Sequence, residues 1–385
     1  MAPALTETLP VRGTPKPKIS DYKEAFNFGP SVYNADAERN GDGEFAPAKY
    51  PNYLPVWDAT KVDPPLQPFE HYDHGKDADP TFPNLLTKDA VVNDLTGDIG
   101  AEVSGIQLSK LSDKGKDELA LFVAQKKVVA FRNQDLADLP IQEAVNFGGY
   151  FGRHHTHVTS GSPKGFPEIH LVHRSAGDRS QAERYFKEHT NSITWHSDVS
   201  FELQPPGTTF LYLLEGPAAG GDTLFLNQVE AYNRLSPEFR KRLHGLKAVH
   251  SGFEQATTSQ HHGGVVKRAP VANEHPIVRT HPVTGEKALF INPQFTRYIV
   301  GYKKEESDML LNFLYQHMAL SQDVQARVKW APGTVAVWDN RVTAHSAILD
   351  WCDGQRRHLA RLTPQAERPT ESFDDKEFKE FNVVK

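Results

Sequence analysis

The sequence predicts a mainly β protein with flanking helices, whose core is a double-stranded β-helix, or jelly roll. Short segments rich in β-branched and aromatic residues dominate the chain beyond residue 190, and Gly, Pro, Asn or Asp bounds each of them. These segments do not alternate regularly with helices, as the strands of a parallel sheet would. The chain has 385 residues, of which 38% are hydrophobic, and this is enough for a sizeable core.

The N-terminal segment differs in composition from the rest of the chain. Residues 1–85 contain many prolines and show neither helical nor strand periodicity. We therefore expect residues 1–85 to form an arm that packs on the body. Residues 86–385 are expected to form one jelly-roll domain.

The first elements of the body are strands mixed with helices. Residues 100–108 alternate as in a strand, and a helix over 112–127 begins with a serine N-cap. A buried strand over 128–133 and a glycine-terminated helix over 141–152 follow. Residues 168–173 are predicted to form another strand.

Strands dominate the second half of the chain. Thr284 and Gly285 mark the turn of a hairpin within it. Two helices interrupt the strands, at about 228–246 and 304–319. The predicted strands cover residues 208–216, 221–227, 275–281, 287–292, 327–331, 334–340 and 356–363.

Composition and charge narrow the possible partners. The 43 basic and 49 acidic residues give a net charge of −6, so we expect no nucleic-acid partner. We find no apolar stretch suited to a membrane span or a secretion leader, and we expect a cytoplasmic protein. The one cysteine, Cys352, is expected to be structural, whereas 18 histidines allow a metal held by imidazole and carboxylate.

The pattern His-x-Asp occurs twice, at His71/Asp73 and at His196/Asp198. The first pair lies in the proline-rich arm, and the second lies on an extended segment, where residues two apart share a face. With His345 as a second imidazole, the second pair would form the two-histidine, one-carboxylate face that iron(II) oxygenases use. The alternative from the residues alone is a histidine that is hydrogen-bonded to a nearby carboxylate.

Several long motifs resemble one family. The segments WHSDVSFELQPPG, EGPAAGGDTLFLN, HPIVRTHPVTGEKALFINPQF, VWDNRVTAHSAILDW and QRRHLARLTPQAERP resemble, in order and spacing, the TauD/TfdA family of iron(II)- and 2-oxoglutarate-dependent dioxygenases. KYPNYLPVWD in the arm and TPQAERP near the end are similar to the fungal sulfonate dioxygenase branch. The resemblance covers about residues 48–370 and implies Fe(II), the co-substrate 2-oxoglutarate and O2.

The resemblance also implies residue roles. His196, Asp198 and His345 match the iron ligands of the family. Thr223 and Arg357 match the pair that binds the distal carboxylate of 2-oxoglutarate. A guanidinium and a hydroxyl suit that task, because both donate hydrogen bonds to a charged partner.

Two arginines compete for the 2-oxoglutarate role. Arg357 and Arg361 share one strand face, and Arg356 lies on the other. The preceding loop is one residue longer than in the bacterial relative, so Arg356 stays the alternative to Arg357.

The substrate pocket is implied in the same way. His157 and Arg361 match the residues that contact a sulfonate, and Val199 would line the pocket. Ser192 stands where the bacterial enzyme has an asparagine that holds the taurine amine, while Phe295 could supply an apolar wall beside a substrate or belong to the core. These departures favour alkanesulfonates other than taurine.

The implied reaction is hydroxylation of the carbon next to an alkyl sulfonate, which releases sulfite and an aldehyde together with succinate and CO2. The same chemistry on an alkyl sulfate, amino acid, aryloxyacid or purine is the alternative. A third interpretation is a jelly roll that binds a small anion without turnover. The family implies a homo-oligomer, a dimer or a tetramer, and Asp339 is expected to contact an iron-bound histidine.

Overall fold

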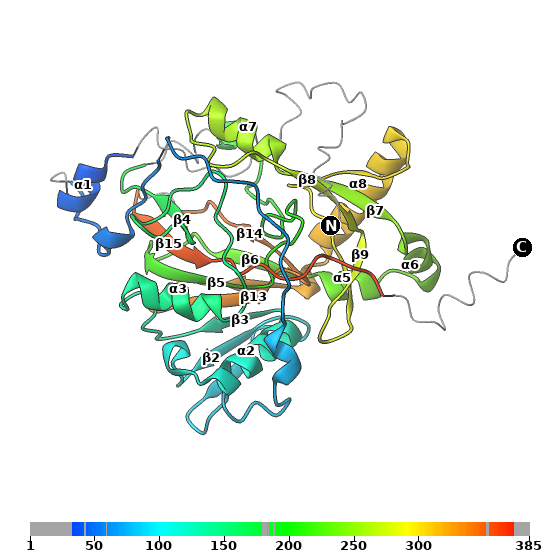
Figure 1. Ribbon diagram of the computed structural model, residues 1–385, viewed down its shortest axis with the longest axis horizontal. Coiled ribbons are helices and arrows are strands. Elements are labelled where there is room, and N and C mark those ends of the chain that lie inside the picture. The colour runs from blue at the N-terminus through cyan, green and yellow to red at the C-terminus, as the bar shows by residue number, and fades with distance from the viewer. Residues whose placement is uncertain are drawn as a thin grey trace, which may run out of the picture.

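A seven-stranded sheet runs through the middle of the molecule (Figure 1). The computed structural model describes residues 33–41, 44–58, 60–178, 183, 185–187, 189–351 and 354–372, so Cys352 lies outside the described residues. In spatial order the strands are β1 (Val91–Asp94), β2 (Ala101–Ser104), β3 (Val128–Phe131), β13 (Val335–Asp339), β5 (Thr208–Glu215), β15 (Arg357–Leu362) and β4 (Ile169–Arg174). All neighbours are antiparallel except β2 and β3, which are parallel.

A second, three-stranded sheet faces the first. It consists of β12 (Gln325–Val328), β6 (Thr223–Asn227) and β14 (Thr343–Ala347). Leu211 and Leu213 of β5 point into the space between the sheets, where they join Phe225 and Val328 in one buried cluster. The two facing sheets confirm the predicted jelly-roll core.

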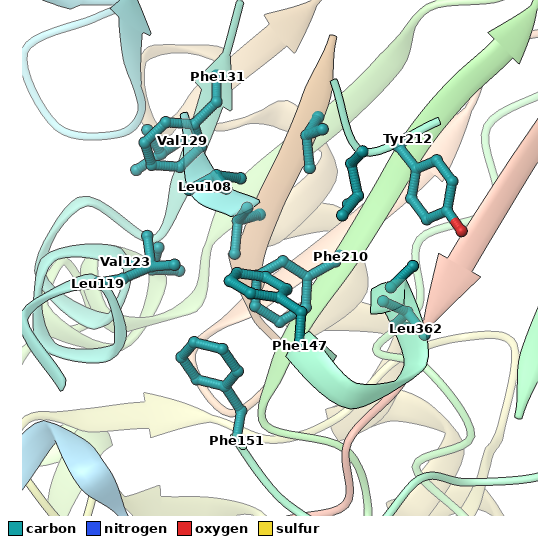
Figure 2. Close-up of a cluster of buried hydrophobic side chains, with 14 of the residues drawn as sticks. Leu108, Leu119, Val123, Val129, Phe131, Phe147, Phe151, Phe210, Tyr212 and Leu362 are labelled. Carbon is teal, nitrogen blue, oxygen red and sulfur yellow. The ribbon is translucent and has the colours of Figure 1, made fainter. Parts of the chain in front are cut away.

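Two helices cover the outer face of the large sheet. They are α2 (Asp113–Lys126) and α3 (Ile141–Gly149). Figure 2 shows Phe147 and Phe151 against Phe210 of β5, within the buried cluster that α2 also enters. Ser112 is the N-cap of α2, as predicted, because its hydroxyl accepts the backbone N–H of Gly115 at 3.2 Å. Among the helices of the described residues, we find none with the length and hydropathy to cross a membrane.

A further layer extends the jelly roll beyond β14 (Figure 1). It contains the three-stranded sheet β11-β7-β8 and the hairpin β9-β10. The turn of that hairpin is where the sequence predicts it, and Gly285 adopts φ +71°, a conformation that favours glycine. The remaining elements of this layer are β7 (Lys247–Ser251), β8 (Ala272–Pro276), β9 (Val278–Thr280), β10 (Lys287–Leu289), β11 (Thr296–Ile299), α5 (Gln228–Asn233), α6 (Pro237–Leu243), α7 (Phe253–His261) and α8 (Lys304–Leu320).

Two predicted elements of this layer are wrong in extent. The helix expected over 228–246 is two helices, because Ser236 caps a new helix that starts at Pro237. The strand expected over 275–281 is also divided: β8 pairs with β7, and β9 pairs with β10. One predicted strand thus contributes to two small sheets.

The described part of the N-terminal segment lies against the body. It holds α1 (Ala35–Asn40) and the short 3-10 turns Pro51–Tyr53 and His74–Asp77. Glu38 accepts a hydrogen bond at 2.6 Å from Arg356, the residue that directly precedes β15. Further along, Val56 forms a β-bridge with Ser162. The segment therefore touches both β15 and the loop that carries His157.

Candidate functional site

The two predicted imidazoles and the predicted carboxylate lie together. His196 and His345 form an antiparallel bridge, with backbone N–H to carbonyl distances of 3.0 and 2.8 Å. The Nε2 atoms of His196 and His345 lie 3.9 and 3.6 Å from Oδ1 of Asp198. All three potential ligand atoms lie within 4.8 Å of one another.

Hydrogen bonds fix the ring of His196 and the backbone at Asp198. The carbonyl of Thr194 accepts from Nδ1 of His196 at 2.8 Å, so Nε2 keeps its lone pair for a metal. Asn340 accepts the backbone N–H of Asp198 at 2.9 Å. Burial lowers the pKa of both His196 and His345, which keeps the imidazoles neutral.

This donor set fits iron(II). Two neutral imidazoles and one carboxylate on a single face leave the other coordination positions to co-substrate and oxygen. Burial alone would raise the pKa of Asp198, but the Arg361 guanidinium outweighs it and holds that pKa below its usual value, so the carboxylate is ionised. His196, Asp198 and His345 are thus the residues that would hold the metal.

Val199, which follows the carboxylate, has an unusual backbone. Its φ is +38°, a region that costs a β-branched residue about 1–3 kcal/mol. The side chain is buried in a small cluster with Phe201 and Phe295, and the Phe295 ring lies 6.2 Å from that of His196. Val199 and Phe295 therefore form an apolar wall beside the metal ligands.

Arg361 lies directly beside the metal centre. Its Nη1 donates to Oδ1 of Asp198 at 2.5 Å, and its Nε donates to Nδ1 of His170 at 3.2 Å. The ring of His157 lies 4.2 Å from that of His170, at 39°. His157 thus reaches the same end of the site, and the sequence pattern did not reveal His170.

Arg357 begins β15, at the end of the strand away from Arg361, and Thr223 begins β6, two residues after the Gly221 that Arg357 contacts. Arg357 donates from Nε and Nη2 to the carbonyl of Gly221, at 3.2 and 2.9 Å. The indole N–H of Trp330 donates to the hydroxyl of Thr223 at 3.2 Å, so the Thr223 O–H remains available as a donor. Burial lowers the pKa of Arg357 to about 9, a value at which it is still charged near pH 7.

Arg356 has other partners. It points to the opposite face of β15 and donates to Glu38, to Glu215 at 2.8 Å and to the carbonyl of Ala46 at 3.0 Å. Those ion pairs engage its guanidinium. Of the two candidate arginines, Arg357 is the one on the face that carries Arg361.

Ser192 and Asp339 are both buried and bonded to other parts of the protein. The hydroxyl of Ser192 accepts the backbone N–H of Leu349 at 3.2 Å, and a role of Ser192 beside the substrate stays a prediction. The sequence predicts that Asp339 contacts an iron-bound histidine, but its partners are Arg341 at 2.6 Å and His281 at 3.0 Å. The aspartate belongs to a separate ion-pair cluster.

The other His-x-Asp pair lies in that ion-pair cluster. His71, Asp73 and Glu367 also bring potential ligand atoms within 4.8 Å of one another. Arg341 donates to both carboxylates, and Arg279 donates to Glu367 at 2.5 Å. This group thus offers a single imidazole and two carboxylates, both paired with arginine, and it lacks the second imidazole of the first site.

A jelly roll with two histidines and one carboxylate at its centre defines the class of non-haem iron oxygenases. The profile of the family described as "Taurine catabolism dioxygenase TauD, TfdA family" matches residues 92–363. The chain belongs to this family and is an iron(II)- and 2-oxoglutarate-dependent dioxygenase.

Individual relatives agree with that assignment. The "Alpha-ketoglutarate-dependent sulfonate dioxygenase" of Saccharomyces cerevisiae is 48% identical over 330 residues, which are 85% of this chain and 80% of that protein. The "Alpha-ketoglutarate-dependent dioxygenase cnsP" of Penicillium expansum is 42% identical over 349 residues, or 90% and 93% of the two chains. A taurine dioxygenase structure from Burkholderia xenovorans has a TM-score of 0.60 at 33% identity, and the match covers 74% of this chain and 93% of that one.

Proposed function

We propose that the enzyme hydroxylates the carbon next to the sulfur of a small alkyl sulfonate. The position of Arg361 carries this proposal, because its guanidinium touches the metal-binding carboxylate of Asp198 at 2.5 Å. An anionic headgroup bound by Arg361 would thus lie beside the metal. The first C–H bond beyond that headgroup is then the one closest to the reacting centre.

The apolar wall supports the same orientation. Val199 and Phe295 are 3% and 2% exposed, and they offer no hydrogen bond to a charged group. An alkyl chain suits that wall, and the charge of the headgroup suits Arg361 and His157. The yeast relative is named for sulfonate oxidation, which favours a sulfonate over other anions.

At the other end, we propose that Arg357 and Thr223 hold the distal carboxylate of 2-oxoglutarate. Arg357 offers a charged fork, and Thr223 offers its O–H because Trp330 occupies its acceptor side. Iron(II) held by His196, Asp198 and His345 would supply the oxidation, in which the alkyl sulfonate, O2 and 2-oxoglutarate give the α-hydroxysulfonate, succinate and CO2. The α-hydroxysulfonate then loses sulfite and becomes an aldehyde.

We also propose a cytoplasmic setting and a small anionic organic substrate as the main partner. The net charge of −6 supports the expectation that no nucleic acid is bound. A homo-oligomer, as a dimer or a tetramer, remains part of the proposal.

Succinate and sulfite release test the function. We expect equimolar succinate and sulfite with iron(II), 2-oxoglutarate and an alkanesulfonate, and smaller rates with taurine. Succinate formed on an alkyl sulfate, amino acid, aryloxyacid or purine, without any turnover of sulfonates, would overturn the sulfonate proposal. No oxygen consumption with any of these compounds would instead support a binding protein without turnover.

Two matched variants on one strand face sharpen the assay. Arg361→Ala should raise KM for the sulfonate by about tenfold or more, because a charged hydrogen bond is lost. Arg357→Ala should raise KM for 2-oxoglutarate by a similar factor. Equal effects of each variant on both KM values would contradict the assignment of the two ends.

A further inference from the structure

His170 is paired with Arg361 across two strands. The two residues are register partners in the antiparallel pair β4–β15, so their side chains share one face of the sheet. Nε of Arg361 donates to Nδ1 of His170 at 3.2 Å, and a guanidinium cannot accept a hydrogen bond. Nδ1 of His170 is therefore the acceptor, and the ring proton is on Nε2.

His157 is held in the same tautomer by different contacts. Its Nδ1 accepts the backbone N–H groups of Thr159 and Ser160, at 3.2 and 3.1 Å. The ring proton of His157 must then also be on Nε2. Within the described part of the chain, no hydrogen-bond partner is found for Nε2 of either His157 or His170, and each residue is 7% exposed.

Both rings are neutral donors. Burial, together with nearby positive groups such as Arg361, holds the pKa of His157 and of His170 well below the usual range. The rings lie 4.2 Å apart, and both belong to the end of the site that Arg361 defines. That end thus combines one guanidinium with two Nε2–H groups whose donor capacity is unused within the described structure.

We propose that His170 is a specificity-determining residue, whose Nε2–H is a third donor that selects a headgroup with three terminal oxygens. This inference rests on the proposed function, in which an anion binds at Arg361. The –SO3 group of an alkyl sulfonate offers one oxygen to each of Arg361, His157 and His170. The acceptor lone pairs of a carboxylate lie in one plane, whereas the three oxygens of –SO3 point in three directions, so a carboxylate satisfies a donor outside its plane poorly, which is costly for a buried donor.

A purely structural role for His170 makes a different prediction. If its only task were to hold the Arg361 guanidinium, its loss would weaken every anion to the same extent. If His170 is a third donor, its loss instead weakens the binding of a sulfonate selectively. The two roles can be separated because they use different ring nitrogens, Nδ1 for Arg361 and Nε2 for the headgroup.

Two amide variants isolate those nitrogens. In His170→Asn the side-chain oxygen can replace Nδ1 as the acceptor for Arg361, but no donor remains at the Nε2 position. In His170→Gln the longer amide can return a donor near the Nε2 position, which makes this variant the control. Anaerobic titration calorimetry of protein with iron(II) and 2-oxoglutarate measures binding without turnover, and 1-butanesulfonate and pentanoate are probes with equal alkyl chains.

We expect His170→Asn to weaken the binding of 1-butanesulfonate and so to raise its Kd about tenfold. The Kd of the same variant for pentanoate should stay within about twofold of that of the unaltered protein, and His170→Gln should recover most of the sulfonate affinity. An unchanged sulfonate Kd, or equal losses for both probes, would overturn the third-donor role. Unaltered protein that binds pentanoate but no sulfonate would show that the proposed function has failed, and the inference with it.

Discussion

The pattern His-x-Asp gives two different structures in this molecule. At 196–198 the third group is His345, and the site contains two neutral imidazoles for a single carboxylate. At 71–73 the third group is Glu367; the buried Arg341 bridges Asp73 and Glu367, and the buried Arg279 pairs with Glu367. The difference teaches that the partners brought in by the fold, rather than the tripeptide, decide between a metal ligand set and an ion-pair cluster.

Removing one histidine from each of the two sites should have the largest effect and should separate the two sites most clearly. His345→Ala should lower iron(II) affinity by more than the roughly 10–100-fold that loss of an outer-sphere partner costs, and should abolish succinate formation. Iron(II) titration and the succinate assay check both effects. His71→Ala is the matched control and should bind iron(II) as the unaltered protein does; a similar loss in both variants would contradict the assignment of the two sites.

Removing the cation from the ion-pair cluster should affect stability. Arg341→Met leaves Asp73 and Asp339 buried with less compensation, which should lower the free energy of unfolding by about 3–5 kcal/mol. Urea unfolding measures this change. The control is Arg234→Met, because Arg234 pairs with the more exposed Asp98 and Asp323 and should cost less than about 1 kcal/mol. If Arg341→Met lowered the free energy of unfolding as little as Arg234→Met does, the buried cluster would not be structural.

A smaller effect is expected from pH. Burial would raise the pKa of Asp73, but Arg341 outweighs it and holds that pKa below its usual value of 3.8. The charged form then stabilises the fold above the usual carboxyl pKa, and this contribution disappears as the pH falls through the lower folded value. The stability gap between the unaltered protein and Asp73→Asn should therefore narrow as the pH falls below about 4, as thermal unfolding at several pH values would show. A constant gap would mean that the charge of Asp73 does not matter.

The sequence predicts those features that depend on short spacing. The alternation of residues on a strand separates Arg356 from Arg357, and the same rule places His196 and Asp198 on one face. The N-cap at Ser112 and the hairpin turn at Gly285 follow from local backbone requirements.

Features that depend on long-range pairing could not be predicted in this way. His170 lies in an ordinary predicted strand, and only its register with Arg361 brings it to the pocket. Asp339 is the last residue of the buried strand β13 and is close to His345 in sequence, yet His281 and Arg341 determine its environment. Strand β14, which carries His345, is short and flanked by turns, so its pairing with β6 emerges only in the folded sheet.

The bond between Glu38 and Arg356 has a consequence for biosynthesis. The two residues are 318 positions apart, and Arg356 immediately precedes the strand that carries Arg357 and Arg361. A ribosome synthesises Glu38 long before β15, so this bond cannot form until the residues between them have been added. Such distant pairing slows folding and lengthens the time during which apolar surface is exposed, so chaperones would matter most before β15 has emerged.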